Sequence, residues 1–237
     1  MIKNFFPSKI LLLNKKFLKN LLSLMLVIIF IGTIYSIFIS PPDYVQGDSV
    51  RIMYIHVPSS FISLGCFGII AIASILNLVF KIKLMSIAAK SLAPLGLVFT
   101  LVSIVSGSLW GKPTWGTWWV WDARLTSMLI LLIFYLAYVC TWKFVNDFQK
   151  ANKISSLIAI TGSLNLPVIK YSVDWWNTLH QTSSISFTSA PSIHYTMLTP
   201  LVIMLIGMLF YSIIIFLMRY KTELIKLKFK NKKKNEF

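Results

Sequence analysis

The sequence consists of long apolar blocks separated by short polar segments. Six blocks run for roughly 20 residues each, the length that a helix needs to cross the hydrocarbon core of a bilayer. They cover approximately residues 17–39, 57–80, 91–109, 126–145, 154–172 and 196–218. The fifth block is the most polar, because serine, threonine, glycine, asparagine and proline residues interrupt it. The pattern predicts an all-α integral membrane protein, a single domain over residues 1–237 with six transmembrane helices and a basic tail over 219–237.

The basic residues predict which helix ends face the cytoplasm. If the amino terminus is cytoplasmic and the six spans alternate, 19 of the 23 Lys and Arg residues lie on the cytoplasmic side. The outer side then keeps only Arg51, Lys112, Arg124 and Lys170. Membrane proteins concentrate positive charge in their cytoplasmic segments, so both termini are predicted to be cytoplasmic. The same count supports the fifth block as a span, because without it the basic carboxyl-terminal tail would lie outside.

Composition excludes several classes of protein. The chain is 57% apolar and 13% charged, whereas a soluble domain of this length needs far more charge on its surface. The net charge of +16 does not indicate nucleic-acid binding, because the basic residues lie at chain ends and in short loops, without a base-reading motif. Cys66 and Cys140 lie within apolar blocks and form no Cys-x-x-Cys pair, so they are interpreted as packing residues.

Five of the eight tryptophans lie between the third and fourth blocks, in a predicted outer loop. The cluster contains Trp110, Trp115, Trp118, Trp119 and Trp121, followed by Asp122 and Arg124. One-turn spacing within it predicts a short interfacial helix that presents several indoles on one side. Such a cluster is either an aromatic belt at the membrane surface or a flat platform for a large planar ligand. The concentration of indoles, with glycines and a proline between them, favours the platform.

The three histidines fall at or near the same predicted outer face. His56 begins the second span, His180 lies in the last outer loop, and His194 ends that loop. A single histidine at a membrane surface is usually a hydrogen-bonded structural residue. Two of them beside an aromatic platform also fit the axial ligands of an iron porphyrin. Both interpretations stay open for His56 and His180, whereas His194 has no aromatic company and is interpreted as structural.

Arg124 allows two interpretations as well. Its planar guanidinium matches a carboxylate, so it could bind a porphyrin propionate. It could equally form an ion pair with the nearby Asp122, which is the preferred interpretation from the sequence alone.

Three motifs carry a resemblance to a known family. The segment from Trp110 to Ser127 reads W-G-x-x-x-W-G-x-W-W-x-W-D-x-R-L-T-S, which resembles the tryptophan-rich WWD signature of haem-handling membrane proteins in cytochrome c biogenesis. Residues 51–58 read R-I-M-Y-I-H-V-P, and residues 175–181 read W-W-N-T-L-H-Q. On these motifs and its six spans, nearly the whole chain is similar to the haem exporter protein C (CcmC) family.

The resemblance implies a function. Proteins of this family hold haem b at the periplasmic face of the bacterial inner membrane, with two histidines as axial ligands and the tryptophan motif against the macrocycle. By motif, the ligands would be His56 and His180. The family hands haem to the periplasmic haem chaperone CcmE and associates with CcmA, CcmB and the small protein CcmD. Holding and handing over haem needs no catalytic group, so an enzyme is not expected.

Two other functions remain as alternatives. A membrane electron carrier of the cytochrome b type also has spans and histidines, but its ligands usually project from within helices toward the bilayer interior. A solute permease subunit is expected to carry polar groups or broken helices near the bilayer midplane. The polar fifth block, with Asn165 and Pro167, is the only such feature in this sequence.

Overall fold

The computed structural model describes residues 12, 14–181 and 192–235, and all regular elements in these ranges are helices. In chain order they are α2 (Lys15–Ile34), the π-helical turn η1 (Tyr35–Ile39), the 3-10 turn η2 (Asp48–Ile52), α3 (Met53–Phe80), α4 (Lys83–Trp115), α5 (Ala123–Phe144), α6 (Phe148–Ser163), α7 (Asn165–Trp175) and α8 (Tyr195–Asn235). In the described residues they form six stretches that are long and apolar enough to cross a membrane. The prediction of an all-α protein with six transmembrane helices is confirmed, and the chain is a multi-pass membrane protein.

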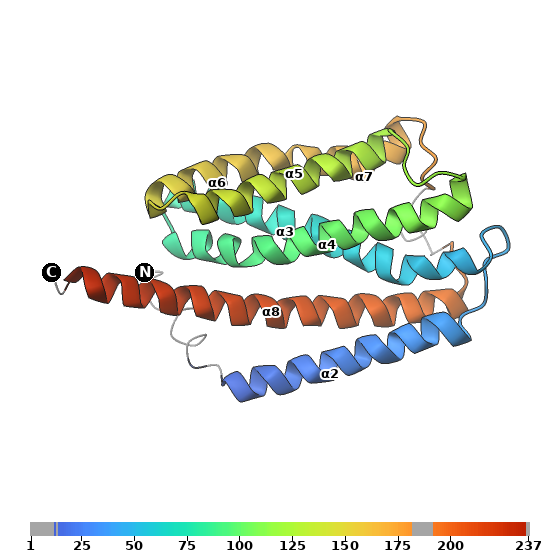
Figure 1. The fold of residues 1–237 in the computed structure, drawn as a ribbon, viewed down its shortest axis with the longest axis horizontal. Coiled ribbons are helices and arrows are strands. Elements are labelled where there is room, and N and C mark those ends of the chain that lie inside the picture. Colours follow the sequence, from blue (N-terminus) through green and yellow to red (C-terminus); the bar gives the residue numbers. More distant parts are fainter. Residues whose placement is uncertain (1–11, 13, 182–191, 236–237) are drawn as a thin grey trace.

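The helices pack as an elongated bundle (Figure 1). Helices α3 and α4 pack closely along their lengths in the middle of the bundle, α5 with α6 and α7 covers one side, and α8 with α2 covers the other. Large side chains fill the centre, including Phe67, Leu131 and Tyr135, which are fully buried. The Tyr135 hydroxyl donates to the carbonyl of Ser63, 2.7 Å away, and so links α5 to α3. Close packing and interhelical hydrogen bonds are what hold helices together in lipid.

The two ends of the bundle differ in their residues. At one end, here called the tryptophan end, α4 finishes at Trp115 and α5 begins at Ala123. At the other, here called the lysine end, α3 finishes at Phe80 and α4 begins at Lys83. Because the spans alternate in direction, the beginning of α3 and the end of α7 also lie at the tryptophan end.

The tryptophan-rich segment does not form the separate short helix that its spacing predicts. Instead, α4 continues past the predicted end of the third span as far as Trp115, and residues 116–122 contain no helix. Gly116 ends α4 because its φ of 77° is left-handed, a conformation that glycine adopts readily. Beyond it, the Thr117 hydroxyl donates to the carbonyl of Trp119 and so favours a local turn.

The weak fifth span is a broken helix. Helix α6 ends at Ser163 and α7 begins at Asn165. Pro167 explains the break, because proline has no N–H to donate to the carbonyl four residues earlier, that of Ser163. Asn165 Nδ2 donates to the carbonyl of Ser127 at 2.8 Å, so this polar residue joins α7 to the start of α5.

Candidate functional site

A cavity opens at the tryptophan end of the bundle. It encloses about 840 Å³ of empty space, part of it open to solvent. Its walls come from α3, α4, α5, α7 and three loops, and its polar lining includes Gln46, His56, Ser60, Ser103, Arg124 and His180. We call this cavity the histidine pocket. Ligand sites in proteins are commonly concave, largely apolar cavities with a few well-placed polar groups.

His56 lies in the first turns of α3 and faces α4. Its Nδ1 is 2.9 Å from the carbonyl oxygen of Ser103 and 3.1 Å from the hydroxyl of Ser106. The ring also packs edge-on against Trp110, with 5.8 Å between the ring centres. Two neighbouring helices therefore fix the orientation of this imidazole.

His180 lies in the coil that follows α7. Its Nδ1 is 2.9 Å from the carbonyl oxygen of Gln181, and its backbone N–H donates to the Thr178 hydroxyl at 3.1 Å. Burial lowers the pKa of His180 below its usual value, and the Arg124 guanidinium lowers it further. A lowered pKa keeps the imidazole neutral, which is the form that binds metal ions.

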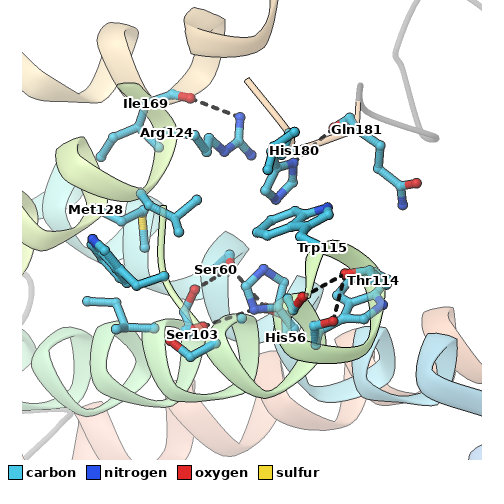
Figure 2. A pocket seen from close by; sticks show the side chains of 18 of the residues that line it. His56, Ser60, Ser103, Thr114, Trp115, Arg124, Met128, Ile169, His180 and Gln181 are labelled. Carbon is cyan, nitrogen blue, oxygen red and sulfur yellow. Dashed lines mark hydrogen bonds between the residues drawn. The ribbon is translucent and has the colours of Figure 1, made fainter. Parts of the chain in front are cut away.

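The fold brings these two histidines together although 124 positions separate them in the sequence. Their ring centres are 6.4 Å apart and their planes are inclined by 38°. Two imidazoles on opposite sides of one metal ion have ring centres about 6 Å apart, because each nitrogen lies about 2 Å from the metal and each ring centre about 1 Å farther out. Figure 2 shows both rings beside the same opening, with Trp115 near them.

A metal held only by protein side chains needs more ligands than this pair. Within residues 12, 14–181 and 192–235, no group of three or more His, Cys, Asp or Glu side chains could hold a metal ion. Two imidazoles suffice, however, when the metal arrives in a macrocycle that supplies the other ligands. The donor set fits a metalloporphyrin better than a free metal ion.

The five clustered tryptophans separate into two groups. Trp110, Trp115 and Trp119 line the histidine pocket, and the Trp115 ring centre is 6.2 Å from that of His180. Trp118 and Trp121 are instead 54% and 75% exposed and do not line the pocket. Because α4 ends at Trp115 and residues 116–122 are not helical, helical spacing does not decide which of the later tryptophans face the pocket.

Arg124 and Asp122 do not form the ion pair that the sequence analysis favours. Asp122 Oδ1 accepts from the backbone N–H of Leu125 at 2.8 Å and so caps the beginning of α5. Arg124 Nη1 donates to the carbonyl of Ile169 at 2.9 Å and lines the pocket (Figure 2). The expected ion pair between Arg124 and Asp122 is wrong, because the cap turns the carboxylate toward the helix backbone. Arg124 therefore keeps its positive charge at the pocket wall.

One residue of the site was missed from the sequence. Gln46 Oε1 accepts from Trp110 Nε1 at 2.8 Å, and Gln46 Nε2 donates to Gln181 Oε1 at 3.1 Å. It thus joins three segments around the pocket, including the residue next to His180. A lone glutamine in a loop carries no motif, so only the fold reveals this role.

His194 lies apart from the histidine pocket. Its Nδ1 is 2.8 Å from the hydroxyl of Thr196, at the start of α8, and its ring packs against Tyr195 with 4.3 Å between ring centres. These contacts agree with the structural interpretation of this histidine.

The fold and the pocket together define a class: a helical membrane protein with a site at one bundle end that suits a flat, metal-containing ligand. Comparison with known proteins gives the family. A family model described as heme exporter protein C (CcmC) matches residues 2–235, so the chain belongs to the CcmC family.

Individual relatives agree with this assignment. Heme exporter protein C of Haemophilus influenzae is 44% identical over 86% of this chain and 82% of its own length. The protein of the same name from Bradyrhizobium diazoefficiens is 40% identical over 93% of this chain and 83% of its own length. That of Escherichia coli K12 is 42% identical over 84% of this chain and 80% of its own length. The resemblance seen in the sequence motifs is confirmed.

Proposed function

We propose that this protein handles haem in cytochrome c maturation: it binds haem b in the histidine pocket and passes it to the chaperone CcmE. The observation that carries the proposal is the pair of imidazoles, 6.4 Å apart, beside an aromatic wall in a member of the CcmC family. His56 and His180 coordinate the iron from opposite faces. Trp110, Trp115 and Trp119 cover part of the macrocycle, and Arg124 binds a propionate.

The proposed location is the bacterial inner membrane, with the tryptophan end facing the periplasm. The support is the excess of Lys and Arg at the lysine end, which is typical of cytoplasmic segments. Reporter fusions after Pro42 and Thr117 should report the periplasm, and fusions near Lys83 and Asn152 the cytoplasm. A cytoplasmic report at Thr117 would contradict the proposal, because haem would then be held on the wrong side for a periplasmic chaperone.

Holding and transferring haem needs geometry and not bond-making catalysis, so no general acid, base or nucleophile is assigned. The proposed partners besides CcmE are the ABC-type subunits CcmA and CcmB and the small protein CcmD. This assignment rests on family membership, and the name heme exporter protein C of the relatives agrees with it.

The test of the proposed function is an absorption spectrum of the purified protein after incubation with haemin. Two imidazole ligands give a six-coordinate low-spin spectrum, which a permease with an aromatic belt would lack. Deleting the gene should abolish c-type cytochromes and leave b-type haem proteins intact. A low-spin haem protein whose deletion leaves c-type cytochromes intact would instead be an electron carrier.

A further inference from the structure

The hydrogen bonds around His56 determine which of its nitrogens can bind a metal. The Ser103 carbonyl, 2.9 Å from Nδ1, can only accept. The Ser106 hydroxyl, 3.1 Å from Nδ1, directs its own proton to the Val102 carbonyl at 2.6 Å and therefore also accepts from the histidine. With two acceptors in front of it, Nδ1 carries the proton. The free electron pair is on Nε2, the nitrogen left for a ligand.

The close approach of His56 to α4 depends on Gly107. A Cβ atom at this position would lie 2.9 Å from Cε1 and 3.4 Å from Nδ1 of His56. One turn deeper, the hydroxyls of Ser60 and Ser103 are 2.5 Å apart and join α3 to α4 again. We call Ser103, Ser106 and Gly107 the His56 cradle. To move this imidazole, the protein would have to break contacts between two central helices.

His180 is held differently. Its described hydrogen bonds stay within residues 178–181, that is, within its own coil. Within the part of the chain that the structure describes, the hydrogen bond from this coil to the opposite wall is the one between the Gln181 and Gln46 side chains, which is exposed to solvent; the His180 ring also packs beside Trp115. Solvent competes for an exposed hydrogen bond between neutral groups, so its net stabilisation is small. Displacing the second imidazole would therefore break hydrogen bonds of one short coil and none between the central helices.

We propose that the two histidines have unequal roles: His56 is the fixed ligand, positioned by its cradle, and His180 is the ligand that leaves when haem is handed over. This inference rests on the proposed function, because it concerns the order in which the two iron–imidazole bonds break. The step is a ligand exchange. The iron loses the neutral Nε2 donor of His180 and gains a lone-pair donor from water or from the acceptor protein. No electron or proton has to be transferred.

The first test compares how fast the full-length protein loses haem when one ligand is removed. Purified protein in detergent micelles is loaded with haemin and mixed with excess apomyoglobin, which captures released haem. His56→Ala should lose haem at least about tenfold faster than His180→Ala, a ratio equivalent to about 1.4 kcal/mol. Spectra of both variants are recorded before mixing, because each should have lost one axial ligand.

The second test addresses the cradle with two matched glycine variants. Gly107→Ala adds a methyl group against His56, whereas a Cβ at Gly65 of α3 would meet nothing within 4 Å. Gly107→Ala should produce a five-coordinate component in the haem spectrum, which added imidazole removes, and should speed haem loss. Gly65→Ala should behave as the wild type. Damage to folding alone would not produce a spectrum that imidazole restores.

A serine pair provides the same comparison without added bulk. Ser106→Ala removes one acceptor of His56, whereas Ser74→Ala removes a buried hydroxyl that donates to the Ile70 carbonyl within α3. Ser106→Ala should shift the haem reduction potential, because the hydrogen bond at Nδ1 alters the basicity of the ligand. Ser74→Ala should leave the potential unchanged.

The outcomes separate this inference from the proposed function. If His56→Ala and His180→Ala both lose a ligand but release haem at equal rates, or His180→Ala releases it faster, the proposal of unequal roles is wrong. The proposed haem site is then still supported. If Gly107→Ala matches Gly65→Ala, the cradle has no positioning role. If both histidine variants keep the wild-type spectrum, the proposed function itself is wrong.

Discussion

The bundle has a cavity at each end, and the two differ in how their polar groups are used. At the lysine end, a cavity of about 610 Å³, part of it open to solvent, is lined by Lys90, Trp142, Glu223 and Lys226 among others. Glu223 lies between the two lysines, 2.6 Å from Lys90 and 2.8 Å from Lys226. Lys90 also lies over the Trp142 ring, 5.1 Å from its centre. We call this cavity the lysine pocket.

The histidine pocket uses its polar groups in another way. Arg124 donates to a backbone carbonyl and has no carboxylate within ion-pairing distance among the described residues. Both imidazoles have their Nδ1 engaged, which leaves Nε2 for a ligand.

The comparison indicates that a cavity suits a ligand only when some of its polar groups are not already paired with one another. Each pocket has a tryptophan and a basic residue in its wall, so neither feature distinguishes them. In the lysine pocket Glu223 pairs with both Lys90 and Lys226, and a ligand would have to compete with these ion pairs. In the histidine pocket a cation and the Nε2 atoms of two imidazoles are available. The predictions below test this difference, from the largest expected effect to the smallest.

Loss of either histidine should have the largest effect. His56→Ala and His180→Ala should each give a five-coordinate haem, and added imidazole should restore the low-spin spectrum by filling the vacant position. Chaperone-bound haem, and with it the c-type cytochromes, should be lost in both variants. The readouts are absorption spectra of purified protein and haem staining of membranes.

The third histidine supplies the control. His194→Ala should be nearly silent, because His194 bonds Thr196 outside the pocket. A changed spectrum in His194→Ala together with unchanged spectra in the other two variants would contradict the ligand assignment.

The aromatic wall should have the next largest effect. Trp115→Ala or Trp119→Ala should weaken haem retention by about 1–3 kcal/mol each, the order found for buried aromatic contacts at binding sites. Trp118→Ala and Trp121→Ala should cost less, about 0.5 kcal/mol each, because both side chains are largely exposed, although Trp121 packs edge-on against Trp119. Haem dissociation from the purified variants measures the difference. Equal losses at all four positions would indicate one continuous platform, contrary to the geometry.

Arg124 should contribute a smaller, more selective effect. A charge-assisted hydrogen bond contributes about 1.5–3 kcal/mol when buried, and Arg124 is half-buried, so about 1 kcal/mol is expected. The wild type should bind haem more tightly than its dimethyl ester, in which both propionates are blocked. Arg124→Gln should remove this preference, as measured by competition between the two ligands. An undiminished preference in the variant would show that another group binds the propionates.

Much of the fold follows from the sequence. The six apolar blocks correspond to the six membrane-length stretches, because each block is long enough to decide its own structure. The prediction of a separate interfacial helix is wrong, since α4 extends to Trp115, ends at Gly116 and is followed by residues that are not helical. Helical periodicity predicts an element only as long as no residue with a left-handed backbone interrupts it.

Of the site, the sequence predicts the types of residue better than their contacts. His56 and His180 lie in motifs that resemble those of the CcmC family. The structure brings the two rings together, because alternating spans place both motifs at the same end of the bundle. Whether Arg124 pairs with Asp122 or faces the pocket depends on whether the Asp122 carboxylate caps a helix. Only the folded chain shows that it does, at the beginning of α5. The contacts of Gln46 could not be predicted from the sequence either, because its hydrogen-bond partners are 64 and 135 positions away.

The smallest effect on haem is expected in the lysine pocket, although its residues should matter for stability. Trp142→Ala and Glu223→Gln should leave the haem spectrum and the rate of haem loss unchanged, because both residues line the pocket at the opposite end of the bundle, where α5 ends. Glu223→Gln should still lower the thermal midpoint slightly, by the equivalent of about 1 kcal/mol or less, since Lys90 and Lys226 are partly exposed and solvent screens their charges. The two readouts are measured on the same samples. If Trp142→Ala weakened haem retention as much as Trp119→Ala, the tryptophan effects would reflect general damage to folding, and the contrast between the two pockets would fail.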